Sequence, residues 1–232
     1  MILVAFILLH LYTLTKLSVP PEYTATVRSY GTYPFAILAW ALSLPLIFHA
    51  LNGGRLILYE SFGLRDDSAM IRWAFALSGL YMLVLGLLML LGDQWASPLF
   101  YWVAVLPFSM ATMYPLARHL WSVPHCLTWR LQRLTAAFLF VVAPAHMLFM
   151  HLNPSVAGDP SLVVSRLQNS FIKGVDLAIL VAVLYHGAYG VTTVLKDYIS
   201  SKRLCASLSL LVYLVMGVLA LAGASIIFPL GV

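Results

Sequence analysis

Five of the seven histidines lie inside long apolar stretches, where an ionisable side chain is costly. An ionisable residue within a membrane segment is a candidate functional residue, because the bilayer core has no water to solvate it. One such histidine alone can simply hydrogen-bond to a neighbouring helix. As a set, imidazoles can ligate a metal or relay protons. The five residues are His10, His49, His146, His151 and His186.

The spacing of four of these histidines indicates a duplicated unit. His10 and His49 are 39 residues apart, and His146 and His186 are 40 residues apart. Each half of the chain is therefore expected to form a helical hairpin with one histidine on each arm. The second arms also match in detail, because both read H-x-x-x-G and both carry an acidic residue eleven positions after the histidine.

The H-x-x-x-G spacing puts the imidazole and the glycine on one face of a helix, one turn apart. Gly53 and Gly190 would leave a bare patch beside His49 and His186, which a porphyrin needs because a larger side chain would collide with its edge. Two imidazoles from facing helices can then be the axial ligands of one b-type haem, a coordination suited to electron transfer. Close helix packing through small residues also explains such glycines, and both interpretations stay open.

Membrane-spanning helices are the elements that must position these residues. The chain is 62% hydrophobic and 9% charged, against about 25% charged residues in soluble domains. We expect an all-α fold, a polytopic transmembrane bundle of five to seven helices with two pseudo-repeated haem-binding hairpins. Apolar runs of about 20 residues span a bilayer. Seven such runs cover residues 1–18, 34–58, 70–92, 97–117, 131–152, 172–196 and 204–230.

Two of the seven runs leave alternatives. The fourth contains Pro107 and Pro115, so it could be a re-entrant or interfacial segment. The first lacks a basic n-region and a small-residue cleavage site, which favours a true helix over a signal peptide. We predict one transmembrane domain over 1–232, with halves of about 1–95 and 130–232 joined by an extra segment of about 96–129.

Basic residues are distributed unequally between the two sides when all seven runs cross the membrane. Nine lysines and arginines fall on one side and four on the other. The side with nine is therefore expected to be the cytoplasmic side of a cell membrane. Acidic residues share that side, so the surface suits docking of a protein better than binding of nucleic acid. The nine are Arg55, Arg65, Arg72, Arg118, Arg130, Arg133, Lys196, Lys202 and Arg203.

Three segments together resemble the cytochrome b membrane anchors of the succinate:quinone oxidoreductase and quinol:fumarate reductase (complex II) family. The stretch HALNGGRLILYESFG, from His49, is similar to the signature H-x-x-x-G-x-R followed by an acidic residue. The stretch HGAYGVTTVLKDYI, from His186, is similar to the partner signature H-x-x-x-G-x-x-x-V-L-x-D-Y. The stretch LQRLTAAFLFVVAPAHM resembles a helix that enters with Q-R-x-T and reaches an H-M dipeptide. Single-chain anchors of this length usually resemble the two-haem type.

The resemblance implies that His49 and His186 ligate a haem b near the cytoplasmic face. It implies that His10 and His146 ligate a second haem nearer the opposite face, and Arg55 is expected to pair with a haem propionate. Such an anchor is not itself the dehydrogenase. It docks an iron-sulfur subunit and an FAD-containing flavoprotein on the cytoplasmic side, and it passes electrons from succinate to a membrane quinone, which we expect to be menaquinone.

The quinone is expected at the cytoplasmic rim, at the ends of two helices. Tyr198 could donate a hydrogen bond to a quinone carbonyl, although an interfacial tyrosine is also an ordinary membrane anchor. Arg133 could polarise the same carbonyl or stabilise the reduced anion. Asp197 and Gln132 complete the predicted quinone-binding set.

The second haem raises a problem of depth. Counted from Met1, His10 lies about 14 Å along a helix axis, and His49 lies about 17 Å from Glu60 by the same rise. These two histidines would then lie at similar depths unless Met1 begins inside the bilayer. His151 is therefore an alternative distal ligand, or a partner for a propionate.

Two other functions remain alternatives. A small proton-coupled transporter could use the histidines as proton relays, and it would contain unwound breaks at the midplane in both halves. Pro45 and Pro144 precede histidines but lie in non-equivalent arms of the repeat. A dihaem anchor of another quinone-linked dehydrogenase would share the haem chemistry and differ in its soluble partner.

Overall fold

The protein is entirely helical over the residues that the computed structural model describes, which are 2–94, 96–153 and 158–228. The predicted all-α membrane bundle is therefore confirmed. Within those residues, six helices are long and apolar enough to cross a bilayer. They are α3 (Tyr33–Phe62), α4 (Asp67–Leu91), α5 (Pro98–Ser122), α6 (Leu127–Leu152), α9 (Ser170–Tyr198) and α10 (Lys202–Ile227).

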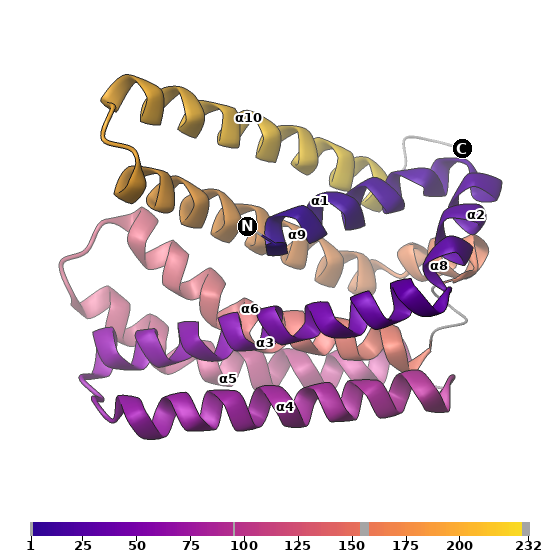
Figure 1. The fold of residues 1–232 in the computed structure, drawn as a ribbon, viewed down its shortest axis with the longest axis horizontal. Helices are drawn as coiled ribbons and strands as arrows, with labels where there is room; N and C mark the ends of the chain where they lie inside the picture. Colours follow the sequence, from indigo (N-terminus) through magenta and orange to yellow (C-terminus); the bar gives the residue numbers. More distant parts are fainter. Residues whose placement is uncertain (1, 95, 154–157, 229–232) are drawn as a thin grey trace.

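The first predicted run, residues 1–18, is helical over its described part, but α1 (Ile2–Thr15) is shorter than the six helices that are long enough to cross a bilayer. Figure 1 shows α1 starting about half-way along the bundle and running to the end where α2 and α8 lie. A three-residue 3₁₀ turn, η1 (Lys16–Ser18), then leads into the next helix. The apolar composition of this segment suits a membrane, but its helix covers only part of the thickness.

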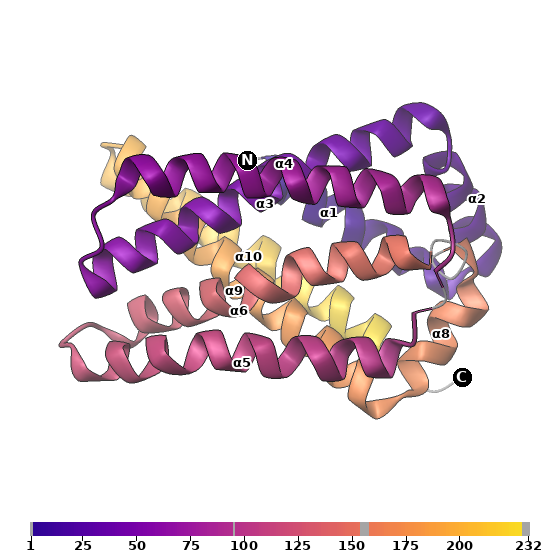
Figure 2. The ribbon, with the colours of Figure 1, turned by 90° about the horizontal axis from the view of Figure 1, so that it is seen from below.

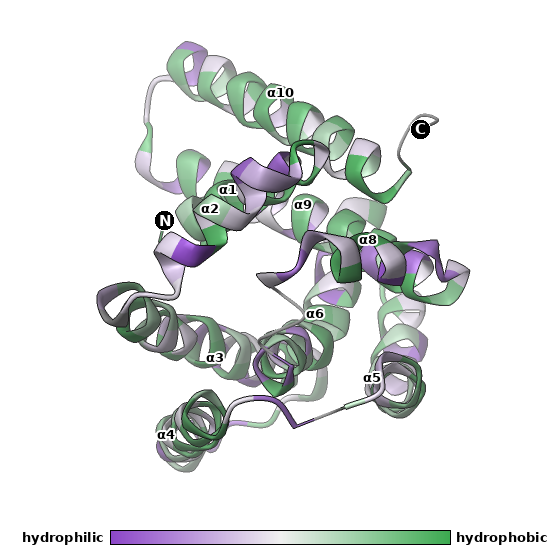
Figure 3. Cartoon of the chain, turned by 90° about the vertical axis from the view of Figure 1, so that its right-hand side faces the viewer, coloured by the Kyte–Doolittle hydropathy of each residue, from purple (hydrophilic) through white to green (hydrophobic). Residues whose placement is uncertain are grey.

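Two short helices that hydropathy did not predict lie together at this end of the bundle (Figure 1). They are α2 (Pro20–Tyr30) and α8 (Pro160–Gln168), and both begin with proline at their first position, where the missing N–H costs nothing. In the chain, α2 lies between the helices of His10 and His49, and α8 lies between the helices of His146 and His186. Figure 3 shows hydrophilic residues on α2 and near α8, whereas the long helices are mainly hydrophobic.

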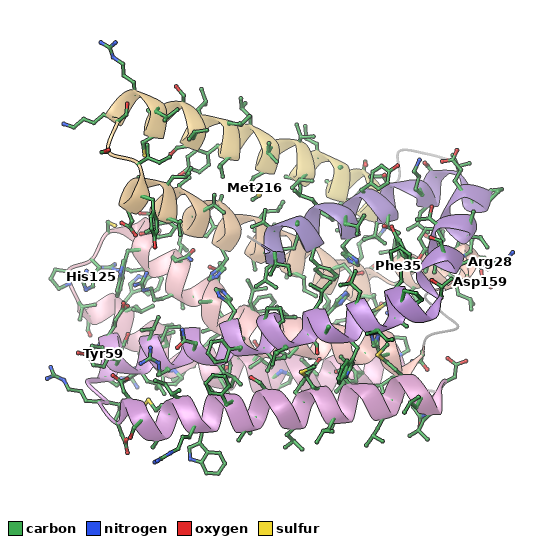
Figure 4. The ribbon with its side chains drawn as sticks, viewed as in Figure 1. Arg28, Phe35, Tyr59, His125, Asp159 and Met216 are labelled. Atoms are coloured by element: carbon green, nitrogen blue, oxygen red, sulfur yellow. The ribbon has the colours of Figure 1, made fainter. Side chains whose placement is uncertain are left out.

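The opposite end of the bundle carries the α3–α4, α5–α6 and α9–α10 connections (Figure 1). We call it the positive end, because the nine basic residues identified above lie in or next to these connections. Figure 4 shows Tyr59 and His125 at this end and Arg28 and Asp159 at the other. Gly63, with φ of 69°, ends α3, and the Asp66 side chain caps α4 by accepting a hydrogen bond from the Ala69 amide.

The segment predicted as a possible re-entrant loop is the continuous 25-residue helix α5. It lies beside α6 along the bundle (Figure 2). Its prolines are tolerated because neighbouring helices can satisfy the backbone groups that proline frees. Trp102 of α5 is only 1% exposed and packs with Val142, Ile172 and Val175 of α6 and α9. Helix α5 is therefore an integral part of the core.

Candidate functional site

His49 of α3 and His186 of α9 lie opposite each other between their two helices. Their ring centroids are 6.1 Å apart and their planes are inclined by 77°. The His186 Nδ1 atom is buried and has no hydrogen-bond partner among the described residues. A buried polar atom without a partner indicates a missing neighbour, since nearly all such atoms are paired in native proteins.

His10 of α1 and His146 of α6 form a second pair with the same geometry. Their ring centroids are 6.3 Å apart and their planes are inclined by 81°. The His146 Nδ1 atom is also buried without a partner among the described residues. Phe6 stacks on His10 at 5.9 Å, and the buried ring of Trp102 lies 6.2 Å from His146. Each pair therefore joins one helix from each half of the chain.

The start of α1 resolves the expected problem of depth. Leu3, Val4 and Ile7 of α1 line the same cavity as His49 and His186, whereas His10 does not line it. His10 is six residues beyond Val4, or about 9 Å further along the axis. The pairs are therefore stacked along the bundle, and the ring that meets His146 belongs to His10.

His151 is not brought into either pair. It lies in the last turn of α6 and makes no ring contact with another histidine within the described part of the chain. Its predicted alternative role as distal ligand finds no support in this geometry.

Both centroid separations suit two imidazoles that share one metal ion. An imidazole nitrogen binds a first-row transition metal at about 2.0–2.1 Å, and each ring centroid lies about 1.2 Å behind its nitrogen, so two opposed rings that share one metal ion have centroids about 6.5 Å apart. The observed values are 6.1 and 6.3 Å. Rotation of one ring about the shared axis does not change this distance, so the steep interplanar angles are compatible with axial ligation.

A cavity of about 1070 Å³ surrounds the first pair and extends on both sides of α3. Its lining includes Gly53 and Gly190, each one turn beyond a histidine. A Cβ atom at either glycine would meet no atom within 4 Å. By contrast, a Cβ at Gly54 would meet the Phe140 ring at 3.0 Å. Close helix packing therefore explains Gly54, whereas Gly53 and Gly190 face open space of the kind that a macrocycle needs.

Arg55 supplies a positive charge at the rim of this cavity. Its Nε donates to Asn52 Oδ1 at 3.0 Å, and its Nη1 donates to Asp67 Oδ1 at 2.5 Å. The Asp67 side chain is about half exposed, so it holds the guanidinium from the solvent side. Arg55 therefore lines the same cavity as His49 and could pair with an anionic group inside it.

The sequence matches the model of a known protein family. The model for the succinate dehydrogenase/fumarate reductase transmembrane subunit matches residues 110–224, about half of the chain. The chain belongs to this family. No curated protein and no solved structure matches it.

The matched range of this transmembrane subunit covers α6 and α9, and with them His146 and His186. His10 and His49 precede the range, so their assignment depends on the pairing observed in the structure. Continuous helices also disfavour the transporter alternative, because α3 and α6 pass through Pro45 and Pro144 without an unwound break.

The four residues predicted to bind quinone are not gathered in one pocket. Gln132 is buried and its Nε2 donates to the His186 carbonyl at 3.5 Å. Arg133 forms an ion pair with Glu60 at 2.7 Å. Tyr198 is 85% exposed at the end of α9, next to Asp197. None of the four predicted residues lines the cavity around the first pair, and their quinone role stays a prediction.

Arg166 of α8 is a candidate that the sequence did not single out. Its Nε is buried without a hydrogen-bond partner among the described residues, and its guanidinium lies over the Phe149 ring, 4.7 Å from the centroid. Phe149 lies one turn beyond His146 on α6, and burial lowers the pKa of Arg166 despite the opposing effect of Asp176. Each histidine pair therefore has one arginine nearby. The available signal was a single arginine in the otherwise weakly charged segment before α9.

Proposed function

We propose that this transmembrane subunit is a dihaem cytochrome b anchor of succinate dehydrogenase. In this proposal, His49 with His186 and His10 with His146 would hold the irons of two b haems. The observation that carries the proposal is that two histidine pairs, formed between different helices, have ring separations within a few tenths of an ångström of the value expected when two imidazoles share one iron.

Bound haem would supply a one-electron carrier with no open coordination position. The chain's own contribution is to hold each pair of imidazoles and to leave space for the macrocycle. At the first pair, Gly53 and Gly190 provide that space. Arg55 and Arg166 would offset the negative charge of propionates, which is costly near the hydrocarbon region. Their guanidinium groups would also favour the reduced state of a nearby haem.

In the proposed assembly, the iron-sulfur and flavoprotein subunits dock at the positive end, on the cytoplasmic side of the cell membrane. Several exposed ionic groups lie there, including the Arg133–Glu60 pair. Electrons from succinate would reach a quinone, proposed to be menaquinone, near this end. Tyr198 is exposed, so its hydroxyl is free to meet a quinone or a partner surface.

Reduction by succinate tests this proposal. The subunit should be purified in mild detergent with the proteins that accompany it, and its spectrum recorded after succinate and then after dithionite. We expect a flavoprotein and an iron-sulfur protein to co-purify and succinate to reduce at least one b haem. If succinate has no effect while the substrate of another dehydrogenase reduces the haem, the chain serves that other enzyme.

The quinone-binding set has a separate test in the same complex. Tyr198→Phe should leave haem content unchanged and lower succinate:quinone reductase activity, because it removes only a hydroxyl at an exposed position. Tyr213→Phe is a suitable control, since Tyr213 is an exposed tyrosine of α10 outside the predicted set. Equal activity in both variants would remove Tyr198 from the quinone site.

A further inference from the structure

Two tyrosine hydroxyls converge on the backbone of α6 just before His146. Tyr81 of α4 donates to the carbonyl of Pro144, and Tyr101 of α5 donates to the carbonyl of Ala145. Both O···O distances are 2.7 Å, the usual length of a good O–H···O bond. Hydroxyls from two different helices thus hold consecutive carbonyls of a third helix.

These contacts fall where α6 is weakest. Pro144 has no N–H, so it cannot donate to the carbonyl four residues earlier, and its ring tends to bend a helix. A bend here would change the height and direction of His146, two residues later. Donors from neighbouring helices restrain such a turn, and in a bilayer no water competes for the carbonyls.

Tyr101 also belongs to the wall around the second pair. Tyr101 packs edge-on against Trp102, with ring centroids 5.5 Å apart, and lies 4.9 Å from the ring of Phe149. Trp102 in turn lies beside His146. At the first pair, the corresponding hydrogen bond to a helix carbonyl is much weaker. The carbonyl of His186 accepts from Gln132 at 3.5 Å, the outer limit for such a bond.

We propose that Tyr81 and Tyr101 are positioning residues for His146. By fixing two carbonyls of α6, they set the height and rotation at which the His146 imidazole meets the ring of His10. Neither hydroxyl touches the imidazole, so both act through the backbone. This inference rests on the proposed function, since it assigns the two tyrosines to the haem of the His10–His146 pair. It also gives α5 a role at the site.

Haem release from the assembled complex measures this positioning. Removing a partner that orients a metal ligand typically weakens binding by about 10–100-fold. In the variant Tyr81→Phe/Tyr101→Phe we therefore expect transfer of haem to apomyoglobin from the His10–His146 pair to be roughly tenfold faster. Each single variant should accelerate haem transfer less. If the double variant does not fold, the transfer rates of the two single variants test the proposal instead.

The release of each haem can be measured separately in variants that lack one histidine pair. His49→Ala leaves only the His10–His146 pair, and His10→Ala leaves only the other. Faster release in the first background and unchanged release in the second is the expected result. Tyr185→Phe is the matched control, because the Tyr185 hydroxyl donates to the Thr128 carbonyl at the start of the same helix, 2.9 Å away and far from His146.

Three outcomes would overturn the inference. Unchanged release in both backgrounds would show that the hydroxyls do not position His146. Equal acceleration in both would indicate general loosening of the bundle, as would an equal effect of Tyr185→Phe. Complete absence of haem from the wild-type complex would overturn the proposed function together with this inference, whereas the first two results leave the function intact.

Discussion

The imidazole rings of His49 and His186 have centroids 6.1 Å apart, although the two residues belong to opposite halves of the chain. A similar separation recurs between His10 and His146. Each pair crosses from one half to the other, so neither half could bind a haem through two of its own histidines. The ligand assignments make several predictions.

Single alanine substitutions should separate the two proposed haems. We expect His49→Ala or His186→Ala to remove one haem, and His10→Ala or His146→Ala to remove the other, because each iron would lose an axial ligand. His151→Ala should retain both, since His151 joins neither pair. A pyridine haemochrome assay on each purified variant measures this. Loss of a haem in His151→Ala with retention in His10→Ala would reverse the distal assignment.

A bulky side chain at Gly190 should block haem binding without unfolding the helix. Leucine has a better helix propensity than glycine, and the space around Gly190 is open in the protein itself. We therefore expect Gly190→Leu to fold and insert but to bind about half of the wild-type haem, as measured by haemochrome per protein.

Gly174→Leu is the matched control for this substitution. Gly174 lies in the same helix and its Cβ direction is also open, but it does not line the cavity. Full haem content in Gly190→Leu, or the same loss in both variants, would contradict the assignment of Gly190 to the haem patch.

Neutralising Arg166 should lower the midpoint potential of one haem. Ferric haem carries one more positive charge than ferrous haem, so removing a nearby cation stabilises the oxidised state. A change of 1.4 kcal/mol equals about 59 mV for a one-electron couple, and we expect a decrease of tens of millivolts in Arg166→Gln by redox titration. Arg28→Gln, at an exposed position on the same end, serves as control. Identical potentials in wild type and Arg166→Gln would exclude Arg166 as a partner of the haem.

Cys126 provides a test of orientation. It is exposed at the positive end, between α5 and α6. In a Cys205→Ser background, a membrane-impermeant maleimide should label Cys126 in inverted vesicles and not in intact cells, because the basic loops are predicted to be cytoplasmic. Labelling in intact cells only would place the positive end outside and reverse the docking side.

The rate of that labelling should depend on Thr128. Its side chain shares a 3.3 Å hydrogen bond with the Cys126 Sγ, which lowers the pKa of the thiol. Thr128→Ala removes this effect, so the thiol pKa rises and less thiolate is present at neutral pH. We expect slower labelling at pH 7 and equal rates well above the ordinary thiol pKa of about 8.5. Equal labelling rates at pH 7 would show that this hydrogen bond does not change the fraction of Cys126 that is present as thiolate.

The positions of the main helices could be predicted from sequence because each contains an apolar run of about 20 residues. The space beside the glycine one turn after His49 and after His186 is open, as a bare patch requires, and the role of these glycines toward haem stays a prediction. Pairing between halves did not follow from periodicity, since it depends on how helices from the two repeats face each other. Only the resemblance to a known family indicated that His49 meets His186.

Other features could not be predicted because they depend on contacts between distant segments. The hydrogen bond from Tyr81 to the Pro144 carbonyl joins α4 to α6, and the sequence around either residue gives no sign of it. The depth of His10 depends on where α1 starts within the bundle. Arg166 is a candidate partner of a propionate because its buried Nε has no hydrogen-bond partner among the described residues, which the sequence does not reveal.

The most direct test of the two-haem assignment is the number of haems bound by the wild-type subunit. A pyridine haemochrome determination on the purified complex, with protein quantified by amino-acid analysis, should give two b haems per chain. One haem per chain would contradict the second pair as a haem site. A chain without haem, in a preparation where the soluble subunits retain their own cofactors, would contradict the central claim.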